Sequence, residues 1–298
     1  MKSSKKLLVA LLVFTMLLST VSIGFAADDA KEAPAVTRAK ALGILKGDQA
    51  GNLNLDKPIT RAEALTLIVR ISGLESSADL MKGMTQFADV TNAHWASGYV
   101  NLGVGQAIVN GYPDGSFKPE GQVTYAEMAK MLLYAMNYGV TVEGAAWPAG
   151  VMGKADQLDL FDDVNAAPNV PALRGDVVAM IDNALTVYHL VQTGYGDLRQ
   201  YEEGKDTFLS KLKVDELEDV VVTEIAKVND KLDDDEIELT EYDKDGKVVK
   251  AARYTLKADV TAEAIFGLKV NAWVNDDDEV FFVKVETAEK DILLDTAK

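Results

Sequence analysis

The sequence predicts an α+β multidomain protein, with an N-terminal all-α region of three repeats followed by a small antiparallel β-barrel or sandwich. Before about residue 190, apolar residues recur at helical spacing and one motif returns along the chain. After about residue 218, short runs rich in β-branched residues alternate with turn residues. The chain has 298 residues, of which 48% are hydrophobic, so it is long enough to form more than one core.

The first 26 residues are predicted to be a signal peptide. Three lysines, Lys2, Lys5 and Lys6, precede an almost wholly apolar run over 7–18, and small residues precede an expected cleavage site after Ala26. The apolar run is short for a membrane span. The sequence therefore predicts a secreted protein with no membrane attachment once the signal is cleaved.

Composition excludes several functional classes. The formal net charge of -17 argues against a nucleic-acid partner, because phosphates need Lys and Arg. The absence of Cys excludes disulfides, thiolate metal sites and cysteine nucleophiles. With only two His, few histidine-dependent catalytic sites are available, and we expect no cofactor.

One motif returns in two close copies and one divergent copy. The segment 43–63 matches 107–127, and a weaker copy runs over 158–176. Each copy is typical of a helix, a loop dense in turn residues and a second helix. In the two close copies Thr60 and Thr124 each precede a Glu by three residues, which is the spacing of a capping box and predicts a helix starting after each Thr.

The second copy resembles the S-layer homology, or SLH, family. It carries Phe87-Ala88-Asp89-Val90, His94-Trp95-Ala96 and Gly111-Tyr112-Pro113-Asp114-Gly115-Ser116-Phe117 in the order of the family pattern. The first copy keeps Ile59-Thr60-Arg61-Ala62-Glu63, and in the third Trp147 stands roughly where the opening aromatic residue belongs. We therefore expect a signal peptide at 1–26, SLH repeats at 27–77, 84–139 and 140–190, a linker at 191–217 and a β domain at 218–298.

The resemblance implies a three-repeat helical pinwheel that binds secondary cell-wall polysaccharide, often carrying pyruvyl ketals, and holds exported proteins at a Gram-positive-type wall. In the family, grooves between repeats receive the sugar and the Arg of the Thr-Arg-Ala-Glu motif contacts the anion. That role carries over to Arg61 and, with Leu173 in place of the Thr, to Arg174. Tyr125 takes the Arg position in the second copy, where the phenol could stack on a sugar ring.

The chemistry of the residues supports an anion site independently. A guanidinium holds a carboxylate with two charge-assisted hydrogen bonds, and a helix N-terminus adds attraction for an anion. Structural alternatives stay open: an Arg in a surface ion pair, Trp95 as a core anchor, and Asp114-Gly115 as a turn. The candidate polysaccharide-binding residues are Arg61, Arg174, Thr60, Trp95, Asp114, Gly115, Tyr125 and Trp147.

The C-terminal third is predicted to be a β domain, with an OB-like barrel as the expected fold. The acidic runs 233–236 and 276–279 fall in predicted loops, where carboxylates could bind Ca²⁺ or could be solvated turns that protect a sheet edge. Strands are expected at 220–223, 236–242, 248–256, 268–274 and 280–285, with a hairpin turn at Lys244-Asp245-Gly246.

These observations favour a non-enzymatic S-layer or surface protein that is anchored in the cell wall, with self-association in a surface layer as a further expectation. Two alternatives remain. The first is an SLH-anchored enzyme of the glycoside hydrolase type, for which the β region offers carboxylates but neither His nor Cys. The second is a surface adhesin whose β domain is another binding module.

Overall fold

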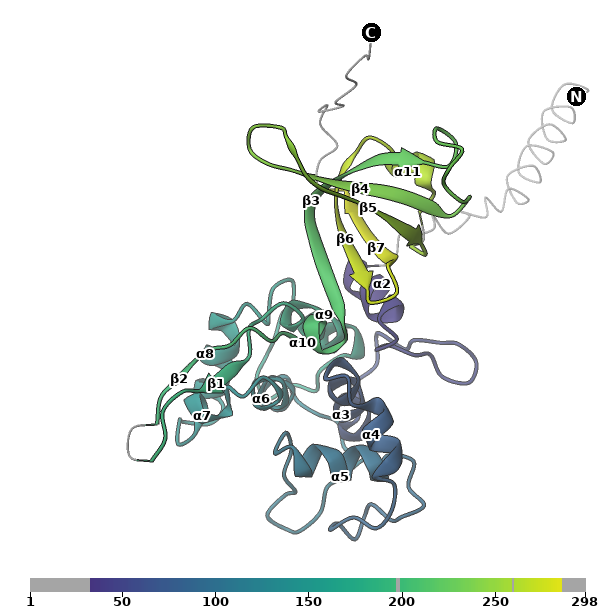
Figure 1. Cartoon of the computed structure of the whole chain (residues 1–298). Coiled ribbons are helices and arrows are strands. Elements are labelled where there is room, and N and C mark those ends of the chain that lie inside the picture. The colour runs from purple at the N-terminus through teal and green to yellow at the C-terminus, as the bar shows by residue number, and fades with distance from the viewer. Residues whose placement is uncertain (1–32, 197–198, 259, 286–298) are drawn as a thin grey trace, which may run out of the picture. The chain divides into compact units, whose positions relative to one another are not determined.

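The computed structural model describes residues 33–196, 199–258 and 260–285, so the predicted signal peptide lies outside the described residues (Figure 1). Within those ranges no helix has the length and apolar character needed to cross a membrane. The helices are α2 (Pro34–Ala41), α3 (Arg61–Ile71), α4 (Glu75–Leu80), α5 (Ser97–Gly105), α6 (Tyr125–Ala135), α7 (Gly139–Val142), α8 (Ala149–Gln157), α9 (Arg174–Ala184), α10 (Phe208–Lys211) and α11 (Ala262–Ile265). The strands are β1 (Leu190–Gln192), β2 (Tyr201–Glu203), β3 (Val214–Ile225), β4 (Glu236–Tyr242), β5 (Val248–Leu256), β6 (Lys269–Asn275) and β7 (Glu279–Val285).

The helices α3, α6 and α9 each begin at the same position of the repeated motif. Both predicted capping boxes are confirmed. The Thr60 hydroxyl accepts a hydrogen bond from the backbone N–H of Glu63, whose carboxylate accepts from the Thr60 N–H, and Thr124 and Glu127 do the same at α6. Leu173 leaves α9 without a side-chain cap.

A closed ring of backbone hydrogen bonds joins the residues just before these three helices. The Ile59 N–H donates to the Ala172 carbonyl at 3.0 Å, the Ala172 N–H donates to the Val123 carbonyl at 2.8 Å, and the Val123 N–H donates to the Ile59 carbonyl at 3.2 Å. Each member is fully buried. The divergent third copy therefore occupies a place equivalent to those of the first two.

The loop of another copy covers each helix start. The first N–H of α3 donates to the Gly121 carbonyl at 2.8 Å, that of α6 to the Val170 carbonyl at 3.2 Å, and that of α9 to the Lys57 carbonyl at 2.8 Å. These bonds use backbone donors that a helix leaves unpaired at its N-terminus. The three copies therefore depend on one another for their backbone hydrogen bonds.

Within the segment 191–217, which we predicted to be a linker, the described residues instead form two strands and a helix, and β3 begins. The strands β1 and β2 pair antiparallel, and α10 follows them (Figure 1). Phe208 is fully buried and, with Leu209, belongs to the same hydrophobic cluster as α3, α6 and α9. Gly194 and Gly204 flank the strands of the hairpin, and Phe208 and Leu209 anchor the segment to the helical core.

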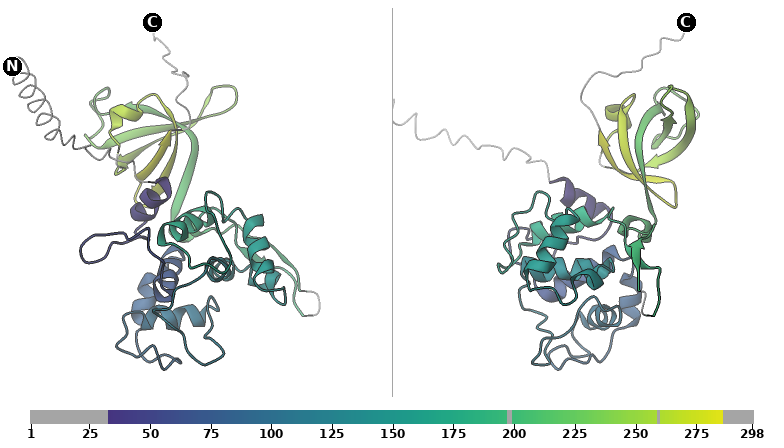
Figure 2. Two further views of the ribbon diagram at one scale, coloured as in Figure 1. Left: turned by 180° about the vertical axis from the view of Figure 1, so that it is seen from behind. Right: turned by 90° about the vertical axis from the view of Figure 1, so that its left-hand side faces the viewer.

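The C-terminal strands form a closed barrel with the order β3-β4-β5-β7-β6, in which β3 also pairs with β6 (Figure 2). The predicted strands are present, but β3 begins at Val214, so the barrel starts before the predicted boundary at 218. The prediction of a purely antiparallel sheet was wrong, because β5 and β7 run parallel. A parallel pair needs a crossover connection, which the segment containing α11 and β6 provides. At the predicted hairpin turn Gly246 has a φ of 75°, which glycine tolerates without strain.

Candidate functional site

A cavity of about 260 Å³ lies beside Arg61, the first residue of α3. Its walls come from α3, from the loop over 108–113, from one face of α6 and from Trp147. The α6 residues are spaced by three or four positions and so share one helix face. They are Glu127, Lys130, Met131 and Tyr134.

The Arg61 side chain is held between this loop and two aromatic rings. Only 8% of the residue is exposed, its Nη2 donates to the Asn110 carbonyl at 2.8 Å, and its guanidinium lies 5.0 Å from the ring centres of both Tyr112 and Phe117. Its Nε is buried without a hydrogen-bond partner, and none of the described carboxylates forms an ion pair with it. Arg61 is therefore a fixed cation with unused donor capacity at the edge of a cavity.

The one carboxylate in this cavity, that of Glu127, already has partners. One of its oxygens accepts from the Tyr112 hydroxyl at 2.9 Å, and the other accepts from the Thr124 N–H at 2.8 Å. Burial and the bond to Glu127 raise the pKa of the Tyr112 phenol, so Tyr112 stays a neutral donor. The Glu127 carboxylate thus links the loop over 108–113 to α6.

The cavity also contains a second cation and an exposed aromatic ring. The Lys130 Nζ lies 5.5 Å from the centre of the Tyr134 ring and 5.8 Å from that of Trp147. Trp147 is 53% exposed and precedes Pro148 through a cis peptide bond. The cavity therefore combines two positive side chains with aromatic faces, a combination suited to an anionic sugar.

Arg174 makes the corresponding contact in the third copy, since its Nη2 donates to the Lys46 carbonyl at 3.3 Å. Unlike Arg61, it lies 3.7 Å from a carboxylate, that of Glu63. Burial lowers the pKa of the Arg174 guanidinium. Part of its charge is already compensated, so Arg61 is the stronger candidate for an anion.

Tyr125 is not among the residues that line the Arg61 cavity. Its ring is buried, its hydroxyl donates to the carboxylate of Asp176, and burial raises the pKa of the phenol. The second copy therefore has a tyrosine where the first copy has the cation Arg61, and the tyrosine hydroxyl forms a hydrogen bond inside the repeat core. The expectation that Tyr125 stacks on a sugar finds no exposed ring face at this position.

The other predicted residues are not among those that line the Arg61 cavity. Trp95 is 50% exposed and packs against His94 and Tyr99, so it is only partly a core anchor. The Asp114 carboxylate accepts hydrogen bonds from Ser116, which with Lys118 lower its pKa to about 2. Gly115 (φ 82°) completes that turn, and Thr60 is committed to its capping box.

Of the eight predicted residues, only Arg61 and Trp147 line this cavity. Sequence reasoning missed Tyr112, Lys130 and Tyr134 as wall residues. A signal for them existed. Glu127, Lys130 and Tyr134 share one helix face, and Tyr112 belongs to the family loop.

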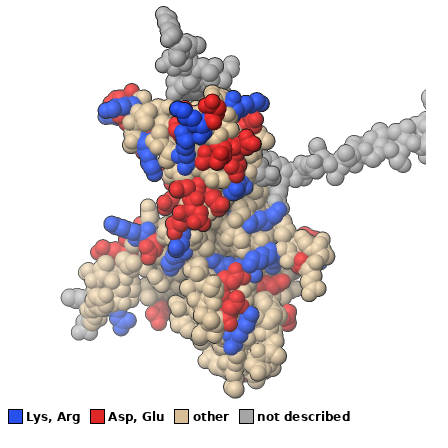
Figure 3. All heavy atoms as spheres, turned by 45° about the vertical axis from the view of Figure 1, so that its right-hand side comes forward, with Lys and Arg blue, Asp and Glu red and all other residues tan. Residues whose placement is uncertain are grey.

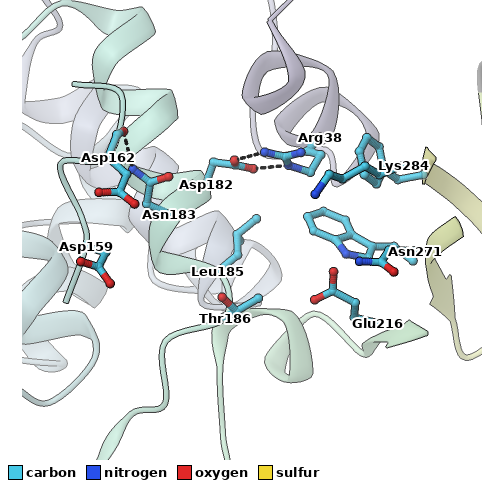
Figure 4. A pocket seen from close by; sticks show the side chains of 12 residues that line it. Arg38, Asp159, Asp162, Asp182, Asn183, Leu185, Thr186, Glu216, Asn271 and Lys284 are labelled. Atoms are coloured by element: carbon cyan, nitrogen blue, oxygen red, sulfur yellow. Dashed lines mark hydrogen bonds and ion pairs between the residues drawn. The ribbon is translucent and has the colours of Figure 1, made fainter. Parts of the chain in front are cut away.

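A second cavity, of about 310 Å³, is lined by Arg38 and Asp182 (Figure 4). Here the cation is already paired: the Arg38 Nε donates to Asp182 at 2.7 Å, and its guanidinium lies 5.8 Å and 5.2 Å from the ring centres of Trp273 and Phe282. The Arg38 guanidinium is thus less available to an anion than that of Arg61.

Carboxylates gather in patches on the face drawn in Figure 3, but among the described residues no group of three or more His, Asp or Glu is arranged to hold a metal ion. Two of the predicted calcium-loop residues are in ion pairs at 3.1 Å, Asp235 with Lys257 and Asp276 with Lys213. Calcium binding at these loops stays a prediction.

Comparison with known proteins gives the family. The S-layer homology domain model matches residues 26–65 and 86–129. The chain is 33% identical over 317 residues to the middle cell wall protein of Brevibacillus brevis, covering 98% of this chain and 30% of that protein. It is 34% identical over 320 residues to the surface layer protein of Brevibacillus choshinensis, covering 99% of this chain and 28% of that protein. The chain belongs to the S-layer homology domain proteins.

The chain spans about 30% of the length of those two relatives. A shorter match of 101 residues at 34% identity, covering 33% of this chain and 18% of the other protein, is to an uncharacterized cell wall amidase of Bacillus anthracis. That relative is named as an enzyme, and this chain matches only a small part of its length.

Proposed function

We propose that this chain anchors an exported protein non-covalently to the bacterial cell wall by binding an anionic secondary polysaccharide at the Arg61 cavity. Arg61 is the observation that carries the proposal, because its guanidinium is fixed at the cavity edge and has no carboxylate partner among the described residues. A pyruvyl ketal offers a carboxylate to such a group. Lys130 adds charge, and the exposed ring of Trp147 offers a face to the sugar.

The proposal includes the finer features of the fold. We assign all three copies to one SLH pinwheel, which the hydrogen-bond ring through Ile59, Val123 and Ala172 supports. We assign the barrel to the OB-like class, which its strand order and its single parallel pair support. Self-association in a surface layer belongs to the same proposal.

A binding role is favoured over the anchored enzyme. The two ring nitrogens of His189 are buried without partners. The Nδ1 of His94 accepts from the Ala96 N–H, and its Nε2 lies 3.5 Å from Glu120. Neither His is among the residues that line the Arg61 cavity. A glycoside hydrolase needs two carboxylates, whereas Glu127 is the one carboxylate among the described lining residues and both its oxygens have partners, so we infer that the cavity holds a ligand rather than converting it.

Sedimentation with sacculi of Brevibacillus brevis, intact or stripped of their polysaccharide, tests the proposal. We expect the purified chain to sediment only with intact sacculi. Because Lys keeps the charge but loses the planar fork of donors, Arg61→Lys should weaken binding about tenfold. Lys130→Ala, which removes an exposed side chain, should weaken it as well.

Lys82→Ala is the matched control for charge, since Lys82 is an exposed cation paired with Asp79 at 2.7 Å and is not among the residues that line the cavity. Arg70 is unsuitable, because it holds both Glu75 and the Ile44 carbonyl. Thermal unfolding of each variant separates lost binding from lost folding. Equal losses in Lys82→Ala and Lys130→Ala would mean that net charge, not a site, retains the protein.

A further inference from the structure

A larger cavity, of about 550 Å³, lies between the end of α6 and the β1–β2 hairpin. None of the described residues that line it is charged, although 26% of the chain is charged. The wall consists of tyrosines, amide side chains and small or aliphatic residues, and we call it the tyrosine cavity. Its lining residues are Gln106, Ala107, Tyr134, Asn137, Gly139, Val140, Leu190, Val191, Gln192, Tyr195 and Tyr201.

The hairpin wall is fixed to the helices by several hydrogen bonds. The Leu190 N–H donates to the Met136 carbonyl at 3.1 Å, and the Asn137 amide donates to the Leu190 carbonyl at 2.9 Å. The Tyr138 hydroxyl donates to the Tyr188 carbonyl at 3.0 Å. The base of the hairpin is therefore held before any ligand arrives, which reduces the entropy lost on binding.

Four polar side chains of the tyrosine cavity are available to a ligand. The hydroxyls of Tyr134, Tyr195 and Tyr201 and the amide of Gln106 form no hydrogen bond with any described residue, and Tyr195 is 77% exposed. Aromatic faces with neutral donors and acceptors suit the apolar faces and the hydroxyls of sugar rings. The lack of charge among the described wall residues disfavours an anionic unit here.

The tyrosine cavity adjoins the Arg61 cavity. Tyr134 lines both, and consecutive residues of one segment line them in turn, with 106–107 in the tyrosine cavity and 108–113 in the Arg61 cavity. The Tyr134 ring, which the two cavities share, packs closely on Gly139, since a Cβ at that position would come within 2.9 Å of the ring. An extended polymer can therefore contact both cavities along the same side of α6.

We propose that the tyrosine cavity binds uncharged sugar units of the polysaccharide whose anionic unit occupies the Arg61 cavity. This inference rests on the proposed function. It divides recognition into a charged subsite, which selects the ketal, and a neutral subsite, which adds affinity through the neighbouring units. Tyr195 and Tyr201 of the hairpin contact the neutral units.

Isothermal titration of the full chain with polysaccharide released from Brevibacillus brevis sacculi tests this division. The polymer is used intact and after mild acid has hydrolysed its ketals. Tyr195→Ala should weaken binding of both polymers about fivefold to tenfold, because one aromatic contact is lost. Tyr188→Ala is the matched control, since Tyr188 is also an exposed tyrosine and is not among the residues that line the cavity.

The outcomes separate the two proposals. Loss in Tyr195→Ala but not in Tyr188→Ala, with a similar factor for both polymers, supports the neutral subsite. Unchanged affinity in Tyr195→Ala, or equal loss in Tyr188→Ala, overturns it, and the Arg61 site stands if Arg61→Lys still weakens binding of the intact polymer. If the unaltered chain binds neither polymer, the proposed function fails and this inference fails with it.

Discussion

His189 is a buried base without a hydrogen-bond partner for its ring. Only 2% of the residue is exposed, both ring nitrogens lack partners, and the edge of the imidazole packs against Phe208 with the ring centres 4.5 Å apart. Burial, assisted by the charge of Lys211 and opposed by that of Asp206, lowers the pKa of His189 from 6.5 to about 4. The neutral imidazole is thus part of the helical core.

This lowered pKa predicts acid sensitivity. The folded chain binds fewer protons at His189 than the unfolded chain, so the free energy of unfolding is highest above pH 6.5 and falls as the pH drops towards 4. The full loss is about 3 kcal/mol. Urea unfolding at pH 7.5, 5.5 and 4.5 measures it.

His189→Phe is the control for this titration, because it keeps an aromatic ring and removes the titrating group. Carboxylates titrate in both proteins, so the difference between the two pH profiles isolates His189. Profiles of the same slope would show that the imidazole is not the acid-sensitive group.

Residue identity alone was a partial guide to the candidate site. Alignment of the copies puts Arg61 and Tyr125 at the same motif position. The partner decides the role: Arg61 meets a backbone carbonyl at a cavity edge, whereas Tyr125 meets the carboxylate of Asp176 inside the repeat core. Nothing in the motif shows which partner the fold supplies, because the partner comes from a different copy.

Among the elements, those with strong local signals were predictable. Capping boxes fix the starts of α3 and α6, and alternating β-branched residues with turn signals fix β4 and β5. The hairpin β1–β2 and α10 were taken for a linker, because each is only three or four residues long and their stability comes from tertiary contacts. The tyrosine cavity depends on that hairpin and was therefore also missed.

The anchoring role of α10 makes a prediction for this element. Phe208 is fully buried in the helical core, so Phe208→Ala should lower the free energy of unfolding by about 3 to 5 kcal/mol. Lys205→Ala, an exposed change in the same segment, should have little effect. Denaturant unfolding of both variants decides between a structural element and a linker, since a linker would tolerate either change.

For the whole molecule, the ring of backbone hydrogen bonds requires three copies, although the family model matches only the first two. Removing the third copy leaves the Ile59 N–H, the Val123 carbonyl and the first N–H of α6 without their partners. Each unpaired buried group costs about 1 to 3 kcal/mol, and these losses add to the exposure of the apolar face of α9. Such a loss is a large share of the stability of an ordinary domain.

We therefore predict that residues 27–213 fold and sediment with intact sacculi, whereas residues 27–139 do neither. The longer fragment keeps the three copies, the hairpin and Phe208, and ends before β3. A boundary at about residue 200 would cut off α10 and expose the core beneath it. Circular dichroism and sedimentation of both fragments, with 214–298 as the barrel control, test this. A folded 27–139 fragment that binds as well as the full chain would show that two copies suffice, and retention of the barrel alone would move the wall-binding site out of the helical region.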